Sequence, residues 1–127
     1  MITNINTANE NRADAKMSHI AAAAEAALAA PFLKIRANDN LMSTVAIHGS
    51  FDPVDAWENN IFHNSRYFIF HITPAKGRRW YDPATDTTVT VELISSGIRW
   101  TAAKFRKYTG SPDKAIAKIA AWMAANA

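Results

Sequence analysis

The chain has 127 residues, with 14 Lys and Arg against 11 Asp and Glu, so its formal net charge is +3. This length suits one domain that can bury a core without a disulfide or a structural metal. The sequence contains no cysteine, which excludes disulfides, thiolate catalysis, iron–sulfur clusters and cysteine-based zinc sites. We expect a single domain over residues 17–127, preceded by a flexible tail over residues 1–16 that is rich in Asn, Thr and Ala.

Three helices are expected along the chain. Residues 18–30 are rich in alanine, the best helix former, and Pro31 ends the run. Asp52 and Pro53 have the residue types of an N-cap and a first helical position, which predicts a helix that continues to about residue 63. The larger apolar side chains of the first helix fall on one stripe, formed by Met17, Ile20, Ala24 and Leu28.

The last helix has the strongest sequence signals. Ser111 is predicted to be its N-cap, Pro112 lies in its first turn, and Asp113 complements the helix dipole there. The apolar side chains that follow recur at helical spacing, at Ile116, Ile119, Ala120 and Met123. One face of this helix is therefore expected to pack on a sheet.

Six strands are expected between these helices. The first two form a hairpin, over residues 32–37 and 41–48, which ends at Gly49 and Ser50. Four more strands form a meander, over residues 66–73, 78–81, 87–95 and 98–108. In the strand over residues 87–95, apolar and polar side chains alternate. Val89, Val91 and Leu93 lie on one side, and Thr88, Thr90 and Glu92 lie on the other. The predicted order is α-β-β-α-β-β-β-β-α, an α+β domain with an antiparallel sheet that has one solvated face.

Charge is distributed unevenly along the chain. Residues 1–65 carry four basic and seven acidic side chains, a balance of −3, whereas residues 66–127 carry ten basic and four acidic ones, a balance of +6. A basic half indicates a partner that bears phosphates. The predicted binding residues combine cations with aromatic rings: Lys76, Arg78, Arg79, Trp80, Tyr81, Lys104, Arg106, Lys107, Lys114 and Lys118. The alternative interpretation is a solvated hairpin edge, protected from aggregation by its charges, with Trp80 in the core.

Residues 53–126 resemble a double-stranded-RNA-binding domain in their length and in their helix–sheet–helix order. The final helix of that family carries a Ser-Lys-Lys-x-Ala-Lys signature, which residues 113–118 match at Lys114, Ala117 and Lys118. The resemblance implies that the two lysines contact phosphates across a groove. Asp113 replaces the serine of the signature, and the middle lysine is also missing.

Two shorter segments resemble other families. The Gly-Ser-Phe-Asp-Pro turn at residues 49–53 resembles a loop of the nucleotidyltransferase superfamily that includes phosphopantetheine adenylyltransferase, but the His-x-Gly-His motif that follows it there is absent. Residues 66–72 resemble the aromatic strand of RNA-recognition motifs. That strand lacks the glycines that let RNA approach the backbone, which favours Phe68, Phe70 and Ile72 as a row of core residues.

No motif predicts a catalytic centre, a metal site or a cofactor. The four histidines, at positions 19, 48, 63 and 71, lack metal-ligand spacing, and we interpret each as a surface residue or a satisfied core residue. His63 and His71 share a site only if the fold brings them together. No run of about 18 apolar residues predicts a membrane span.

Together these patterns favour a small, non-enzymatic, cytoplasmic protein that engages nucleic acid or a nucleoprotein complex through its basic C-terminal half. The alternative is an accessory inhibitor or adaptor from a phage or mobile element that acts by protein–protein contact, as an anti-CRISPR protein does. Aromatic residues and arginines, the types favoured at interface hot spots, are present for such a role. A third hypothesis is a small enzyme whose site assembles only in the fold. The sequence leaves the partner, its DNA, RNA or protein nature, and the oligomeric state open.

Overall fold

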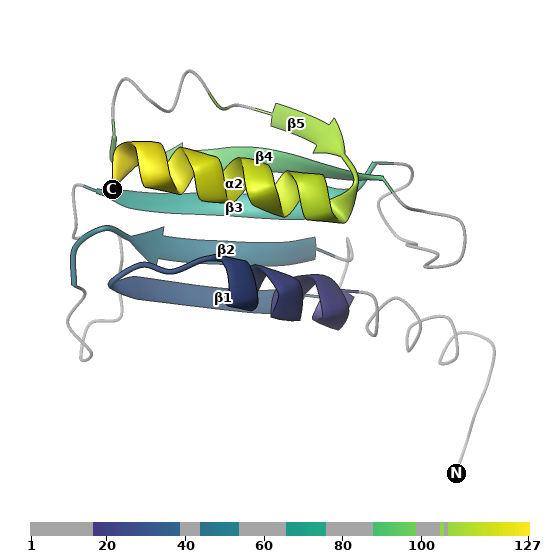
Figure 1. Ribbon diagram of the computed structural model, residues 1–127, viewed down its shortest axis with the longest axis horizontal. Helices are drawn as coiled ribbons and strands as arrows, with labels where there is room; N and C mark the ends of the chain where they lie inside the picture. The colour runs from purple at the N-terminus through teal and green to yellow at the C-terminus, as the bar shows by residue number, and fades with distance from the viewer. Residues whose placement is uncertain (1–16, 39–43, 54–65, 76–87, 99–104, 106) are drawn as a thin grey trace, which may run out of the picture.

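The computed structural model describes residues 17–38, 44–53, 66–75, 88–98, 105 and 107–127. In this part of the chain, two helices cover one face of a five-stranded antiparallel sheet, which is an α+β fold (Figure 1). Each strand pairs with its neighbours in chain order, so the sheet is a continuous meander. Its strands are β1 (Phe32–Asn38), β2 (Thr44–Ser50), β3 (Tyr67–Pro74), β4 (Val89–Ser96) and β5 (Lys107–Gly110).

The alternation predicted for the third meander strand is confirmed in β4. Val89 and Val91 are fully buried, and Leu93 packs against the same core. Glu92, on the opposite side of the strand, is exposed. Because side chains alternate across a strand, this pattern gives the sheet one face toward the helices and one face away from them.

Helix α2 (Pro112–Asn126) begins where its capping residues predict. The side chain of Ser111 accepts a hydrogen bond from the backbone N–H of Lys114 at 3.4 Å, which satisfies one free donor of the first turn. Of the predicted stripe, Ile116, Ile119 and Met123 are buried and Ala120 is half-buried against the same core, and Trp122 joins them.

The first helix covers residues 17–27 and ends three residues before the predicted boundary. Pro31 disfavours helical geometry at the residue before it, and the N–H of Leu28 donates the last helical bond to the carbonyl of Ala24. Its apolar stripe, Met17, Ile20, Ala24 and Leu28, is buried as predicted. Among the described residues, neither helix is long and apolar enough to cross a bilayer.

Several strand boundaries differ from the prediction, mostly by one or two residues, and Ile98 and Phe105, which were predicted to lie in the last strand, are not in a strand. Gly49 and Ser50 do not end the hairpin, because both continue β2 and pair with β1 and β3. Strand β5 extends to Gly110, two residues beyond the predicted end, since Thr109 and Gly110 pair with β4. The predicted tail, the helix expected up to residue 63, the strand over residues 78–81 and most of the strand over residues 98–108 lie outside the described residues.

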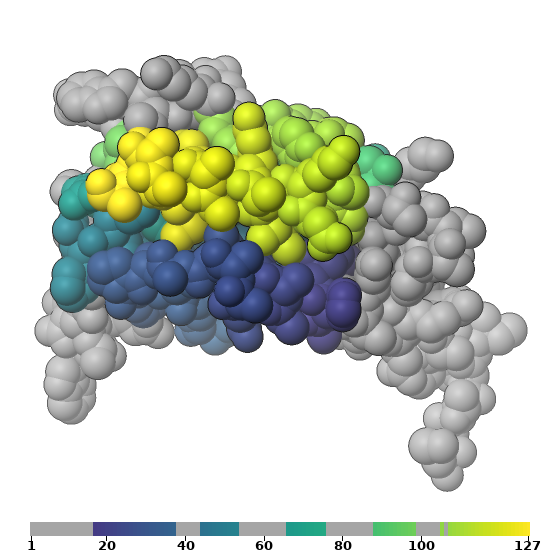
Figure 2. Space-filling view, in the orientation of Figure 1, coloured from purple at the N-terminus to yellow at the C-terminus, as the bar shows by residue number. Residues whose placement is uncertain are grey.

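The centre of the core is a cluster of aromatic rings between the sheet and α2. The ring of Phe70 lies edge-on to those of Trp122 and Phe105, at centroid distances of 5.2 and 5.3 Å. Phe68 contacts Phe51 at 5.0 Å and Trp122 at 5.7 Å. Figure 2 shows the first helix and α2 side by side on one face of the molecule. The strand predicted to resemble that of RNA-recognition motifs therefore places Phe68, Phe70 and Ile72 in the core, as its alternation indicates.

Gly49 leaves room for the Phe68 ring, and we expect Gly49→Ala to destabilise the protein by about 1–3 kcal/mol. A Cβ at this position would lie 2.6 Å from Cε1 of Phe68, whose ring is fully buried and has no space to move. Gly110→Ala is the comparison, because its Cβ would lie 2.6 Å from the hydroxyl and 2.8 Å from Cε1 of Tyr108, whose side chain is half-buried instead of fully buried. Urea unfolding of both variants tests this, and equal losses of stability would contradict the assigned role of Gly49.

Candidate nucleic-acid interface

The face of the sheet that points away from both helices carries charged and polar side chains, although Ile69 and Ser50 on it are buried, and we call it the open face. One row of residues crosses all five strands at the same register, from Arg36 through Ala46, His71 and Glu92 to Lys107. The neighbouring row contains Lys34 opposite His48. Arg36 and Lys107 are exposed and Lys34 is half-buried, so charged groups stand on both edges of the sheet.

The cations of the open face have no ion-pair partner within the described residues. There, the one ion pair is formed by Arg66 and Asp52, which lie at the end of the sheet. Glu92 is a direct cross-strand neighbour of both His71 and Lys107 and is the one carboxylate among the described residues of the face. Two cations on β1 therefore lack a counter-ion among the described residues, and a bound phosphate can supply one.

Aromatic rings accompany these charges at one end of the open face. Phe32 on β1 and Tyr67 on β3 flank Ser50 of β2, so they are two strand spacings apart, about 9–10 Å. The hydroxyl of Tyr67 hydrogen-bonds to that of Ser95 at 2.9 Å, which fixes the ring on the sheet. Flat rings beside cations are the combination that holds single-stranded nucleic acid, since bases stack while phosphates pair.

Lys34, Arg36, His48 and His71 form a group that we call the histidine–cation cluster. His48 lies directly opposite Lys34, and His71 is its diagonal neighbour on β3. Burial lowers the pKa of His48 below its ordinary value, and the charges of His71, Lys34 and Arg36 lower it further. Burial also lowers the pKa of His71, although Glu92 partly opposes this shift. Both rings are therefore neutral at pH 7.

These lowered pKa values make the folded protein less stable in acid. The unfolded chain, whose histidines titrate near 6.5, binds more protons than the folded one. The contribution of each neutral ring is fully present above pH 6.5 and is lost as the pH falls below that value. We expect the midpoint of thermal unfolding to drop between pH 7.5 and pH 5.5, and to drop less in the His48→Gln, His71→Gln double variant. An identical drop in both proteins, measured by circular dichroism, would contradict this assignment.

The predicted binding residues that the structure describes do not all lie together. Lys107 belongs to the open face, because it pairs with Glu92. Lys114 and Lys118 are exposed on α2, in the other layer, and the ammonium of Lys118 lies 6.0 Å from the ring of Tyr108. The remaining predicted residues, Lys76, Arg78, Arg79, Trp80, Tyr81, Lys104 and Arg106, lie outside the described residues.

Sequence analysis missed two cations of the open face. Lys34 and Arg36 belong to the half of the chain with a negative balance, so counting charge by halves hid them. The signal that identifies them is the alternation of the strand Phe32–Asn38, in which Lys34 and Arg36 alternate with Leu33, Ile35 and Ala37. His71 has His48 as its neighbour, whereas His63 lies outside the described residues.

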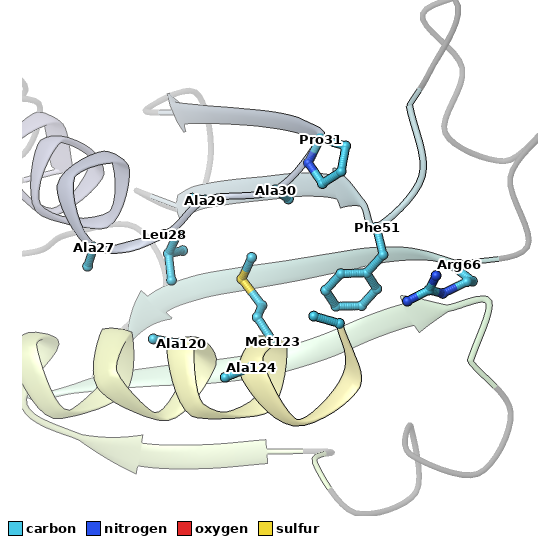
Figure 3. Close-up of a pocket in the computed structure, with 11 residues that line it drawn as sticks. Ala27, Leu28, Ala29, Ala30, Pro31, Phe51, Arg66, Ala120, Met123 and Ala124 are labelled. Atoms are coloured by element: carbon cyan, nitrogen blue, oxygen red, sulfur yellow. The ribbon is translucent and has the colours of Figure 1, made fainter.

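A pocket of about 410 Å³ lies between the C-terminal ends of the first helix and α2 (Figure 3). Its lining is almost entirely apolar: Ala27, Leu28, Ala29, Ala30, Pro31, Phe51, Arg66, Ala120, Met123, Ala124 and Ala127. Figure 3 shows Met123 pointing into its middle and the guanidinium of Arg66 beside the Phe51 ring at one end. Arg66 is the one charged side chain of this lining.

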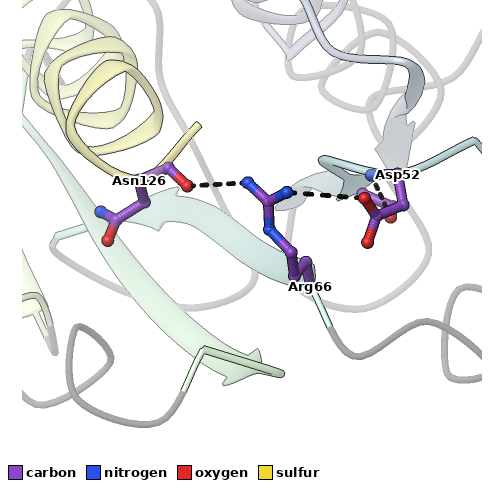
Figure 4. A network of polar contacts seen from close by, with 4 residues as sticks. Asp52, Arg66 and Asn126 are labelled. Carbon is purple, nitrogen blue, oxygen red and sulfur yellow. Dashed lines mark hydrogen bonds and ion pairs between the residues drawn. The ribbon is translucent and has the colours of Figure 1, made fainter.

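The guanidinium of Arg66 already has partners, as Figure 4 shows. It lies 3.5 Å from the carboxylate of Asp52 and donates to the backbone carbonyl of Asn126 at 3.3 Å. It also covers the ring of Phe51 at 5.4 Å. The residue therefore caps the C-terminal end of α2 and joins it to β2 and β3. Because two helix C-termini carry partial negative charge here, the pocket has little to attract an anion.

Comparisons with protein families, with curated proteins and with solved structures give no match for this chain. Within the described residues, no group of three or more His, Cys, Asp or Glu side chains could hold a metal ion. The open face, whose cations form no ion pair with another described residue and lie on the same face as two rings, is therefore the candidate site on which a function can be argued.

Proposed function

We propose that this protein is a non-enzymatic, cytoplasmic binding protein that holds single-stranded nucleic acid on the open face of its sheet. The observation that carries the proposal is the set of three cations on this face, Lys34, Arg36 and Lys107, none of which is in an ion pair with another described residue. Phe32 and Tyr67 supply rings on which bases can stack. The basic segment over residues 76–81 remains a predicted extension of this surface.

The width of the sheet favours a single strand over a duplex. Five strands are four spacings wide, about 19 Å between the outer two, whereas the major groove of B-DNA is about 12 Å wide. A two-stranded ribbon fits that groove and a five-stranded sheet does not. A single strand can instead lie across the strands with its bases on the face.

The test is the binding of a fluorescently labelled oligothymidylate, measured by anisotropy at increasing salt, beside a duplex of the same length. Three phosphate contacts give a salt slope of about −2, so a fourfold increase in salt weakens binding about twentyfold. Preference for the single strand and this slope support the proposal. Absence of binding to single-stranded DNA and RNA at low salt overturns it, and capture of a nuclease-insensitive protein partner then favours the inhibitor or adaptor alternative.

A further inference from the structure

The histidine–cation cluster is placed so that a bound phosphate changes the charge of the rings beside it. His48 lies between Lys34 on one neighbouring strand and His71 on the other, so three basic groups meet across β1, β2 and β3. His48 is directly opposite Lys34 and one diagonal from His71, separations of about 7–8 Å or less, whereas Lys34 and His71 are two strands apart. A phosphate that pairs with Lys34 therefore also lies beside an imidazole.

We propose that His48 and His71 take up protons when the open face binds phosphate groups, so that nucleic-acid binding tightens as the pH falls. This inference rests on the proposed function and adds its regulation. The proton comes from solvent and goes to the free ring nitrogen, and no covalent bond of the nucleic acid changes. A protonated imidazole donates from both nitrogens, so each uptake adds a cation and a hydrogen-bond donor to the site.

The charged groups around the two rings are Lys34 and Arg36 on β1, Glu92 on β4 and Lys107 on β5, and they act in opposite directions. In the free protein, burial and the charges of His71, Lys34 and Arg36 hold the pKa of His48 below its ordinary value, whereas Glu92 raises that of His71. A phosphate anion reverses the local charge and favours the protonated ring. By linkage, a ligand that raises these pKa values binds more tightly in acid.

Glu92 affects the pKa of His71 but is not a cross-strand neighbour of His48. It faces His71 directly across β3 and β4, and it raises the pKa of His71 against the effect of burial. No carboxylate among the described residues is a cross-strand neighbour of His48. The gain in charge on binding is therefore expected to be larger at His48 than at His71, and His48→Gln alone removes most of the pH dependence.

The first experiment measures oligothymidylate affinity from pH 5.5 to pH 8.5 at constant ionic strength, because thymine does not titrate in this range. We expect the affinity of the wild type to rise at least about tenfold between pH 7.5 and pH 5.5. We expect His48→Gln with His71→Gln to show a nearly flat profile while it still binds at pH 8. His19→Gln is the control, since His19 is exposed on the first helix in the other layer and its loss leaves the profile unchanged.

The second experiment measures the heat of binding to the wild type at pH 6.5 in two buffers with different protonation enthalpies. A net uptake of protons supports the inference without any substitution. Binding with no uptake, or an equal pH profile in wild type and double variant, overturns it and leaves the proposed function standing. Absence of binding at every pH overturns the proposed function itself, so the two failures are distinguishable.

Discussion

Replacing Lys34 and Arg36 together by glutamine is expected to weaken the binding of single-stranded nucleic acid by about tenfold or more at low salt. Each lost phosphate contact removes about 0.7 from the salt slope, so the slope falls from about −2 to about −0.6. Glutamine keeps most of the side-chain length and removes the charge, and both positions lie on the outer face of an edge strand. Anisotropy titrations at several salt concentrations measure both effects.

The matched control removes two charges from the other layer of the molecule. Lys114→Gln with Lys118→Gln changes exposed side chains of α2 and gives the same change in net charge. We expect this variant to bind nearly as the wild type does. Loss of binding in the α2 variant alone would contradict the proposal. It would show that the interface lies on the helix layer, as the resemblance to double-stranded-RNA-binding domains implies.

Phe70→Ala is expected to cost about 3–5 kcal/mol of unfolding free energy, a large fraction of the stability of a small domain. Its ring is fully buried and lies 5.2–5.9 Å from the rings of Trp122, Phe105 and Phe68. Removing it leaves a cavity between the sheet and α2 that rigid neighbours cannot fill. Urea unfolding followed by circular dichroism measures the loss.

Two further substitutions show whether the loss comes from that cavity. Phe70→Leu keeps an apolar side chain in the site and is expected to cost less than Phe70→Ala. Ile94→Ala removes a large apolar side chain from β4 that is 48% exposed, and is expected to cost less than about 1 kcal/mol. If Phe70→Ala were no worse than Ile94→Ala, the ring cluster would not be the centre of the core.

Local signals in the sequence predicted most of the described fold. Alternation in residues 87–95 gave both faces of β4, and the Ser111 cap located the start of α2. The predicted boundary at Gly49 is wrong because a glycine can also lie within a strand, where it makes room for a neighbouring side chain. In the fold this glycine is the second-last residue of β2, where the missing side chain makes space for Phe68, and that requirement comes from a neighbouring strand.

The candidate site was less accessible to sequence analysis, for a physical reason. Lys34 and Lys107 are 73 positions apart in the sequence and lie on opposite edges of one sheet. A count of charge along the chain cannot combine them, because it is the register of four strand pairs that puts them on one face. Each strand shows its own alternation, but which faces coincide depends on pairing. The histidines of the open face became neighbours in the same way.

The meander order of the sheet has a consequence for how quickly the chain acquires its fold. Each strand pairs with the next one along the chain, so the pairings are local in sequence, and the longest connection, residues 51–66, is short compared with the whole chain, which favours rapid kinetics. The two helices are different, since residues 17–27 precede the whole sheet and α2 follows it. The packing of the two helices against each other brings together distant parts of the chain and closes the longest loop. We therefore expect it to be the last step of folding, the step that shields the ring cluster from water.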